Sequence, residues 1–123
     1  ISPDLNEQKI LEILDVISFN KIDGIIATNT SVNFPKLNSK NRHEKGGLSG
    51  APIYDRSNEV ISFISKSTNG KLPIIGVGGI STVDQAIEKI KSGAHLIQIY
   101  TGLIYEGPGF IKRINKELLN YKL

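Results

Sequence analysis

The stretch IIGVGGIST, from Ile74 to Thr82, decides the fold. An apolar run that reads as a strand ends at a cluster of glycines, and two hydroxyl residues follow where a helix would begin. Thr82 and Gln85 have the spacing of a capping box, which marks the first turn of a helix. The stretch therefore predicts a strand that passes directly into a helix, the repeating unit of α/β proteins.

The same alternation continues on both sides of this stretch. Strands are expected at residues 24–29, 72–77 and 96–100, because these runs are apolar and bounded by turn residues. Helical spacing and end signals predict four helices: one that Asp4 can cap and that continues through Ile17, one through Val60 and Ile64 to Asn69-Gly70, one from Thr82 to Gly93, and one from Pro108 through Leu118.

Strands and helices that alternate through short links predict parallel strands with crossover helices. The runs IIA and PIIGV are apolar on both faces, as strands covered on both sides should be. A (β/α)8 TIM barrel needs eight strands and about 250 residues, whereas this chain has 123 residues and three expected strands. We therefore predict an α/β fold that is about half of such a barrel, or else a small open sheet, with residues 1–123 as a fragment of one domain.

Composition excludes several functional classes. The chain has no cysteine, and its net charge of +3 is too small to argue for a nucleic-acid partner. No signal-peptide pattern opens the sequence, and no apolar run approaches the roughly 20 residues of a membrane span. No metal-binding motif occurs. We expect His43 to lie in a solvated loop and His95 to have a structural role.

The presence of Gly78 and Gly79 at the end of the strand can be explained in two ways. They could form a plain tight turn, or they could let a ligand lie against bare backbone. Main-chain amides between a strand end and a helix start favour a bound phosphate. The next strand ends in Tyr100-Thr101-Gly102, with similar chemistry, and barrels often build phosphate sites from their last two loops. A dinucleotide fingerprint is rejected, because Ser81 replaces its third glycine and no acidic residue follows at the right distance.

Two further segments carry polar groups or glycines. ATNTS, residues 27–31, places Asn29 at the end of a strand, where its amide could hold a ligand or cap a local turn. KGGLSG, residues 45–50, lies in a long connection over residues 30–52. It fits a glycine-rich lid better than a nucleophile turn, because Ala51 stands where G-x-S-x-G needs glycine. A flexible surface loop stays open as the alternative.

Taken in order, GIIATNTS, KGGLSGAP, LPIIGVGGI and GAHLIQIYTGLIYEGP resemble the C-terminal half of dihydroorotate dehydrogenase. The resemblance is to the quinone-linked class 2 form, since class 1 enzymes usually carry a V-G-T-A type sequence where this chain has residues 99–102. It implies a (β/α)8 barrel that binds FMN and oxidises dihydroorotate to orotate in pyrimidine biosynthesis. A base removes the C5 proton, hydride passes from C6 to the flavin, and a quinone accepts the electrons.

The resemblance also implies roles for seven residues. FMN contacts are expected at Thr28, Gly50, Gly79, Tyr100 and Thr101. Among these, the Gly79 amide, Tyr100 and Thr101 are expected to contact the phosphate. Asn29 and Thr30 are expected to hold the pyrimidine substrate. The glycine amides would neutralise the phosphate without a buried cation.

Other parts of such an enzyme are expected outside this chain. The catalytic serine base lies upstream in the family, and a lysine should immediately precede Ile1. Membrane-docking helices, also outside the chain, would make the enzyme peripheral to the bacterial cytoplasmic or mitochondrial inner membrane. We therefore expect no catalytic residue here, and we expect the isolated chain to be soluble, inactive and weak in FMN binding. Its partner would be the N-terminal half of the barrel.

Two alternatives stay open. The chain could belong to another phosphate- or FMN-binding barrel enzyme, such as an isomerase or an FMN oxidase of different specificity. It could also be a non-catalytic half-barrel that dimerises through unpaired strand edges. RNA binding by the basic loop is the weakest reading, because the charge is diffuse.

Overall fold

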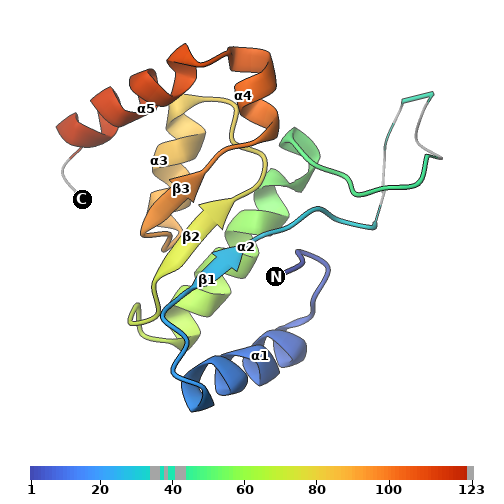
Figure 1. Cartoon of the computed structure of the whole chain (residues 1–123), viewed down its shortest axis with the longest axis vertical. Helices are drawn as coiled ribbons and strands as arrows, with labels where there is room; N and C mark the ends of the chain where they lie inside the picture. The colour runs from blue at the N-terminus through green and yellow to red at the C-terminus, as the bar shows by residue number, and fades with distance from the viewer. Residues whose placement is uncertain (34–36, 38, 41–43, 122–123) are drawn as a thin grey trace.

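The computed structural model describes residues 1–33, 37, 39–40 and 44–121, in which helices alternate with the strands of one sheet (Figure 1). The strands pair in the order β1-β2-β3, and both pairings are parallel. The predicted α/β fold with parallel strands and crossover helices is therefore confirmed. The elements are α1 Glu7–Phe19, β1 Ile25–Ala27, the 3-10 helix η1 Ala51–Ile53, α2 Tyr54–Ser67, β2 Ile74–Val77, α3 Val83–Lys91, β3 Leu96–Gln98, α4 Thr101–Glu106 and α5 Gly109–Asn120.

The register of the sheet brings the three strand ends together. Ala27 pairs with Gly76, which in turn pairs with Ile97, so the carboxyl ends lie along one edge. The polar segments that follow each strand therefore start side by side. In open α/β sheets, this edge is where ligands bind.

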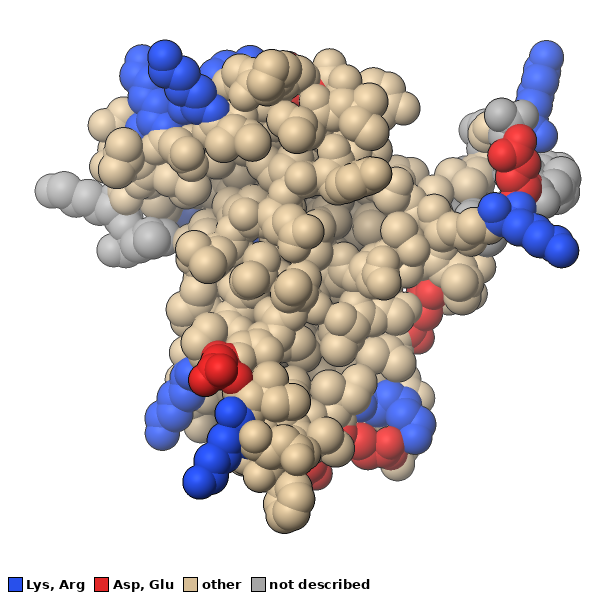
Figure 2. All heavy atoms as spheres, viewed as in Figure 1, with Lys and Arg blue, Asp and Glu red and all other residues tan. Residues whose placement is uncertain are grey.

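The helices cover only one face of the sheet. On the other face, Ile26 is 48% exposed and Leu96 is 63% exposed. Figure 2, drawn from the side of this face, shows charged side chains mainly at the periphery of the molecule. The expectation that both faces are covered is therefore wrong for the described residues. An apolar face of this kind is what strands present to the interior of a closed barrel.

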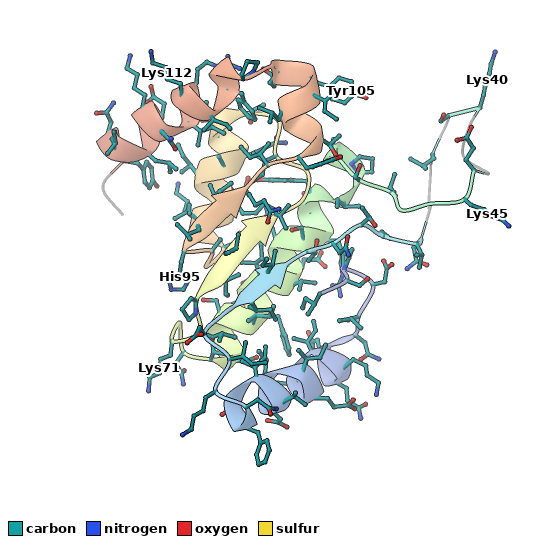
Figure 3. All side chains as sticks on the ribbon, in the orientation of Figure 1. Lys40, Lys45, Lys71, His95, Tyr105 and Lys112 are labelled. Atoms are coloured by element: carbon teal, nitrogen blue, oxygen red, sulfur yellow. The ribbon has the colours of Figure 1, made fainter. Side chains whose placement is uncertain are left out.

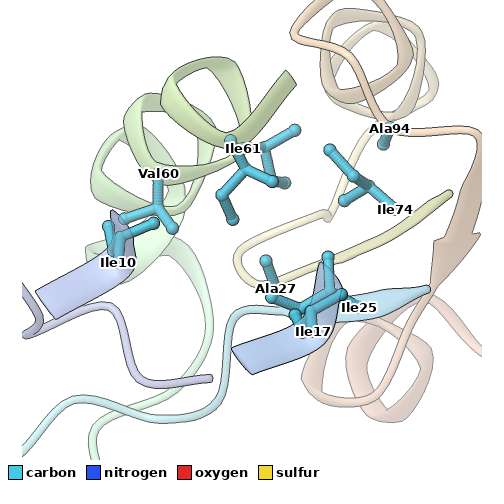
Figure 4. Packing of buried hydrophobic residues seen from close by; sticks show 9 residues of the cluster. Ile10, Ile17, Ile25, Ala27, Val60, Ile61, Ile74 and Ala94 are labelled. Atoms are coloured by element: carbon cyan, nitrogen blue, oxygen red, sulfur yellow. The ribbon is translucent and has the colours of Figure 1, made fainter. Parts of the chain in front are cut away.

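Two apolar clusters hold the strands in place. The main core lies between the sheet and helices α1 and α2 (Figure 4), and a smaller cluster joins α3 and α5. Removing this apolar surface from water supplies the main stabilising free energy and fixes the strand ends that carry the polar loops. The buried members are Ile10, Ile17, Ile25, Ala27, Val60, Ile61, Ile64, Ile74 and Ala94 in the first cluster, and Ile80, Ala86, Phe110 and Ile114 in the second.

Several element boundaries differ from the predictions. The N-cap of α1 is Asn6, whose side chain accepts a hydrogen bond from the Lys9 amide at 2.9 Å, so the prediction that Asp4 caps this helix is wrong. Each strand is also shorter than expected. α4 is an additional helix that sequence periodicity does not indicate, because it has only 6 residues. The capping box of Thr82 and Gln85 is confirmed.

Candidate functional site

A cavity of about 510 Å³ lies at the carboxyl ends of the three strands. Ligand pockets commonly occupy roughly 300–1,000 Å³. Segments far apart in the sequence meet in its wall, which contains all seven residues with predicted ligand contacts: Thr28, Asn29, Thr30, Gly50, Gly79, Tyr100 and Thr101. These seven residues therefore share one site, while the role of each stays a prediction.

The turn after β2 lines the cavity with bare backbone. Gly78 has φ 118° and Gly79 has φ 76°, conformations that residues with a Cβ rarely adopt. A Cβ on Gly79 would also lie 2.6 Å from the Cα of Tyr54. Among the described residues, none accepts a hydrogen bond from the Gly79 amide. An unpaired amide in a glycine turn is suited to an anion.

Gln85 fixes the exit of this turn. Its Oε1 accepts hydrogen bonds from the Ser81 amide at 2.8 Å, the Ser81 hydroxyl at 2.9 Å and the Thr82 amide at 3.1 Å. The Ser81 hydroxyl is thus engaged within the capping box. The glycine amides, rather than the following hydroxyls, remain available to a ligand.

Thr28 contributes a buried polar group with no described partner. Its side chain is 2% exposed, and no described group forms a hydrogen bond with its Oγ1. Leaving a buried polar group unsatisfied costs about 1–3 kcal/mol. Because Thr28 lines the cavity, a bound ligand could satisfy this hydroxyl.

The start of α4 meets the glycine-rich loop in the cavity wall. The Thr101 hydroxyl donates a hydrogen bond to the Ser49 hydroxyl at 2.9 Å. A Cβ on Gly50 would lie 3.1 Å from Cγ2 of Thr101, so a small residue permits this close approach. Residues 49 and 50 therefore form part of the cavity wall, while the lid stays a prediction.

Asn29 and Thr30 occupy the exposed side of the cavity. The Asn29 Oδ1 accepts a hydrogen bond from the Thr30 amide at 2.8 Å, and the Asn29 main-chain N–H donates to the Ile1 carbonyl at 2.7 Å. The side-chain oxygen is therefore used in the local turn, as the alternative interpretation of this segment expects. The Asn29 side-chain nitrogen has no partner among the described residues and can donate to a ligand.

Asp4 anchors the start of the long loop instead of capping α1. Its carboxylate accepts hydrogen bonds from the Ser31 hydroxyl at 2.6 Å and the Val32 amide at 2.7 Å. Burial alone would raise the pKa of Asp4, but these hydrogen bonds bring that pKa below its ordinary value. Ser31 also forms an antiparallel bridge with Leu48, so Asp4 supports both sides of the loop near the cavity.

Sequence reasoning missed two polar side chains of this region. Gln98 lines the cavity from β3 and could have been found from its register with Val77. Lys89 of α3 is 0% exposed and lies behind the glycine turn, where its Nζ donates a hydrogen bond to Ser57 at 3.0 Å. The sequence does not indicate a buried cation near the glycine turn, and neutralisation of a phosphate by the amides alone stays a prediction. Helical spacing alone places Lys89 on an ordinary polar position and does not reveal its burial.

Other candidates lie away from the cavity. His95 immediately precedes β3 and lies at the opposite end of the sheet from Tyr105 of α4 (Figure 3). Its Nδ1 accepts a hydrogen bond from the Ile74 amide at 3.2 Å, consistent with a structural role. His43 lies outside the described residues. Within the described ranges there is no cluster of three or more metal-ligating residues, and no helix has the length and hydropathy of a membrane span.

The fold and the site define a class: a parallel α/β unit with a cavity at the carboxyl ends of its strands and a glycine turn suited to an anion. The family description "Dihydroorotate dehydrogenase" matches residues 1–121, and the chain belongs to the dihydroorotate dehydrogenase family. This confirms the resemblance found in the sequence motifs.

Individual relatives agree with this assignment. The chain is 51% identical over 119 residues to dihydroorotate dehydrogenase (quinone) of Christiangramia forsetii, covering 97% of the chain and 35% of that protein. It is 50% identical over 121 residues to the protein of the same name from Buchnera aphidicola, and this match covers 96% of the chain and 35% of that protein. A crystal structure of DHODH from Eimeria tenella with ferulenol matches with a TM-score of 0.91 and 42% identity, over 98% of this chain and 32% of that one. The chain thus spans about one third of these relatives.

Proposed function

We propose that this chain contributes cofactor and substrate contacts to a quinone-dependent dihydroorotate dehydrogenase. The enzyme would oxidise dihydroorotate to orotate, with a quinone as electron acceptor. The observation that carries the proposal is that seven predicted contact residues share one cavity in a chain of this family. Residues 1–123 would form the C-terminal part of a single (β/α)8 barrel domain, with the open sheet face toward the barrel interior.

The donor set of the cavity fits FMN. Gly79 offers an unpaired amide for the phosphate, and Thr28 offers a buried hydroxyl without a described partner. Tyr100 and Thr101 would complete the phosphate contacts, and Gly50 would let the ligand lie against main chain. When bound, FMN supplies the hydride acceptor, while these residues bind and orient it.

Asn29 and Thr30 would hold dihydroorotate at the exposed side of the same cavity. An amide matches the alternating N–H and C=O groups of the pyrimidine ring edge, because it offers a donor and an acceptor together. The unpaired side-chain nitrogen of Asn29 would accordingly donate to a ring carbonyl. Both residues position the substrate and transfer no proton.

The catalytic base is proposed to lie outside this chain, because the chain would supply only one side of the FMN and substrate pocket. The isolated chain is therefore expected to bind FMN weakly and to lack turnover. The remaining part of the barrel would be its partner. Membrane contact, at the periphery of a bacterial cytoplasmic or mitochondrial inner membrane, would be made by segments outside residues 1–123, and no nucleic-acid partner is proposed.

Two preparations test this proposal. The full-length protein should carry a yellow flavin chromophore and reduce a quinone when dihydroorotate is added, whereas the isolated chain supplied with FMN should not. A full-length protein without a chromophore would favour a barrel isomerase instead. Turnover by the isolated chain would overturn the assignment of the base to another segment.

A further inference from the structure

Lys89 is a fully buried cation on the helix side of the glycine turn. Its side chain is 0% exposed, and its Nζ donates to Oγ of Ser57 at 3.0 Å. The same Ser57 hydroxyl donates a hydrogen bond to the Val77 carbonyl at 2.7 Å. Val77 immediately precedes Gly78 and Gly79, so two hydrogen bonds connect the ammonium to the strand end that carries the turn.

The groups around Lys89 also contact the turn. Its Nζ lies 4.9 Å from the centre of the Tyr54 ring. Tyr54 is the residue that a Cβ on Gly79 would strike, and a Cβ on Gly78 would lie 3.1 Å from Oγ of Ser57. The side chains of Tyr54 and Ser57, which contact the ammonium, therefore also pack against the two glycines of the turn.

The chain makes room for this lysine. A Cβ on Gly76 would lie 2.8 Å from Cγ and 3.0 Å from Cδ of Lys89. Gly76 lies within β2, so its absent side chain leaves space for the lysine stem to lie against the strand. Gly76 thus makes room for the Lys89 side chain, while Gly78 and Gly79 form the turn.

Lys89 has no ion-pair partner within 4.0 Å among the described residues. The neighbouring Glu88 carboxylate accepts a hydrogen bond from the Tyr54 hydroxyl at 2.7 Å. A buried charge without a counterion destabilises a folded protein, and apolar replacement often stabilises it. The structure therefore contains a buried positive charge that lacks a local counterion and lies behind a turn with an unpaired amide.

We propose that Lys89 is a positioning residue for the anion-binding turn and acts as the buried countercharge of a phosphate monoester bound at the Gly78–Gly79 amides. The lysine does not touch the ligand. It acts through Ser57 and the Val77 carbonyl, which hold the turn in place, and through its charge, which favours a dianion in a water-poor site. This inference rests on the proposed FMN site and adds a residue outside the cavity wall.

The test uses Lys89→Met in the full-length protein, because methionine keeps most of the stem and removes the charge. Apoprotein is titrated with FMN and with riboflavin, which has the same ring system without the phosphate. We expect the FMN dissociation constant to rise about tenfold and the riboflavin constant to stay unchanged. The thermal midpoint of the apoprotein should stay the same or rise, since an unpaired buried charge is removed.

Lys91→Met is the matched control, because Lys91 lies on the same helix with its side chain exposed. It should change neither flavin constant. Equal losses of FMN and riboflavin affinity, or a lower midpoint with unchanged FMN affinity, would show that Lys89 is only structural and would overturn this inference. If the unsubstituted protein binds no FMN at all, the proposed function fails. The role of Lys89 is then tested separately, with inorganic phosphate as the anion probe.

Discussion

The main-chain N–H of Thr28 donates a hydrogen bond to the Val77 carbonyl at 2.8 Å. The same carbonyl accepts a hydrogen bond from the Ser57 hydroxyl at 2.7 Å. One oxygen at the end of β2 therefore joins the end of β1, on the cavity side, to the buried network of α2 and α3. A change on the helix side of the sheet can thus reach the cavity through a short chain of hydrogen bonds.

Gly79→Ala should damage both the fold and the site. The new Cβ would meet the Tyr54 backbone and would force alanine into a left-handed conformation. We expect a loss of unfolding free energy of about 2 kcal/mol or more, measured by urea denaturation, and a loss of FMN binding.

Gly70→Ala is the control for that substitution. Gly70 has φ 68°, but nothing lies within 4 Å of its added Cβ. It should show the conformational destabilisation alone, about 1 kcal/mol, with FMN affinity retained. If the two variants bind FMN equally well, Gly79 does not contact the cofactor.

Thr101→Val should weaken the contact between the start of α4 and the glycine-rich loop in the cavity wall. The substitution removes the hydroxyl that donates to Ser49 at 2.9 Å while keeping the volume of the side chain. We expect the FMN dissociation constant to rise roughly tenfold. Thr101→Ser, which keeps the hydroxyl, should restore most of the affinity, and equal affinities of both variants would contradict this role.

Asp4→Asn should release the start of the long loop at neutral pH. Folding lowers the pKa of Asp4, so its stabilising contribution is present above the ordinary carboxyl pKa and is lost as pH falls through the folded value. We expect a loss of about 1 kcal/mol at pH 7 and a flatter acid limb in pH-dependent denaturation. The same change at the exposed Asp15 of α1 should leave both properties unaltered.

Lys89 should give the apoprotein an unusual alkaline response. Burial lowers the pKa of Lys89 to about 8, although the nearby Glu88 and Asp55 carboxylates oppose this shift. The unfolded chain then binds more protons than the folded chain above pH 8, so the unfolding free energy should rise with pH. The clean window ends near pH 10, where the unfolded tyrosine ionises and the buried Tyr54, with a pKa of about 12, reverses the trend.

FMN affinity should change in the opposite direction over the same window. Loss of the Lys89 proton removes the countercharge, so binding should weaken as pH rises above 8. Lys89→Met should abolish both pH effects. Parallel rather than opposed trends in stability and affinity, measured by denaturation and flavin fluorescence, would contradict the account of Lys89.

The fold was largely predictable because its signals are local. Capping spacing at Thr82 and Gln85 and the apolar strand runs lie within single segments of sequence. The cavity wall was also predictable, since the carboxyl ends of neighbouring parallel strands must meet. The burial of Lys89 was not predictable, because it depends on space left by Gly76 on another element. The role of Asp4 could not be predicted for a similar reason: its partners, Ser31 and Val32, are distant in sequence.

The most direct test of the central claim is a crystal structure of the full-length protein with FMN bound. The account predicts one flavin in the cavity at the strand ends, with a phosphate oxygen within hydrogen-bond distance of the Gly79 amide and the Thr101 residue beside it. A phosphate bound anywhere else, with the Gly79 amide unoccupied, would contradict the account.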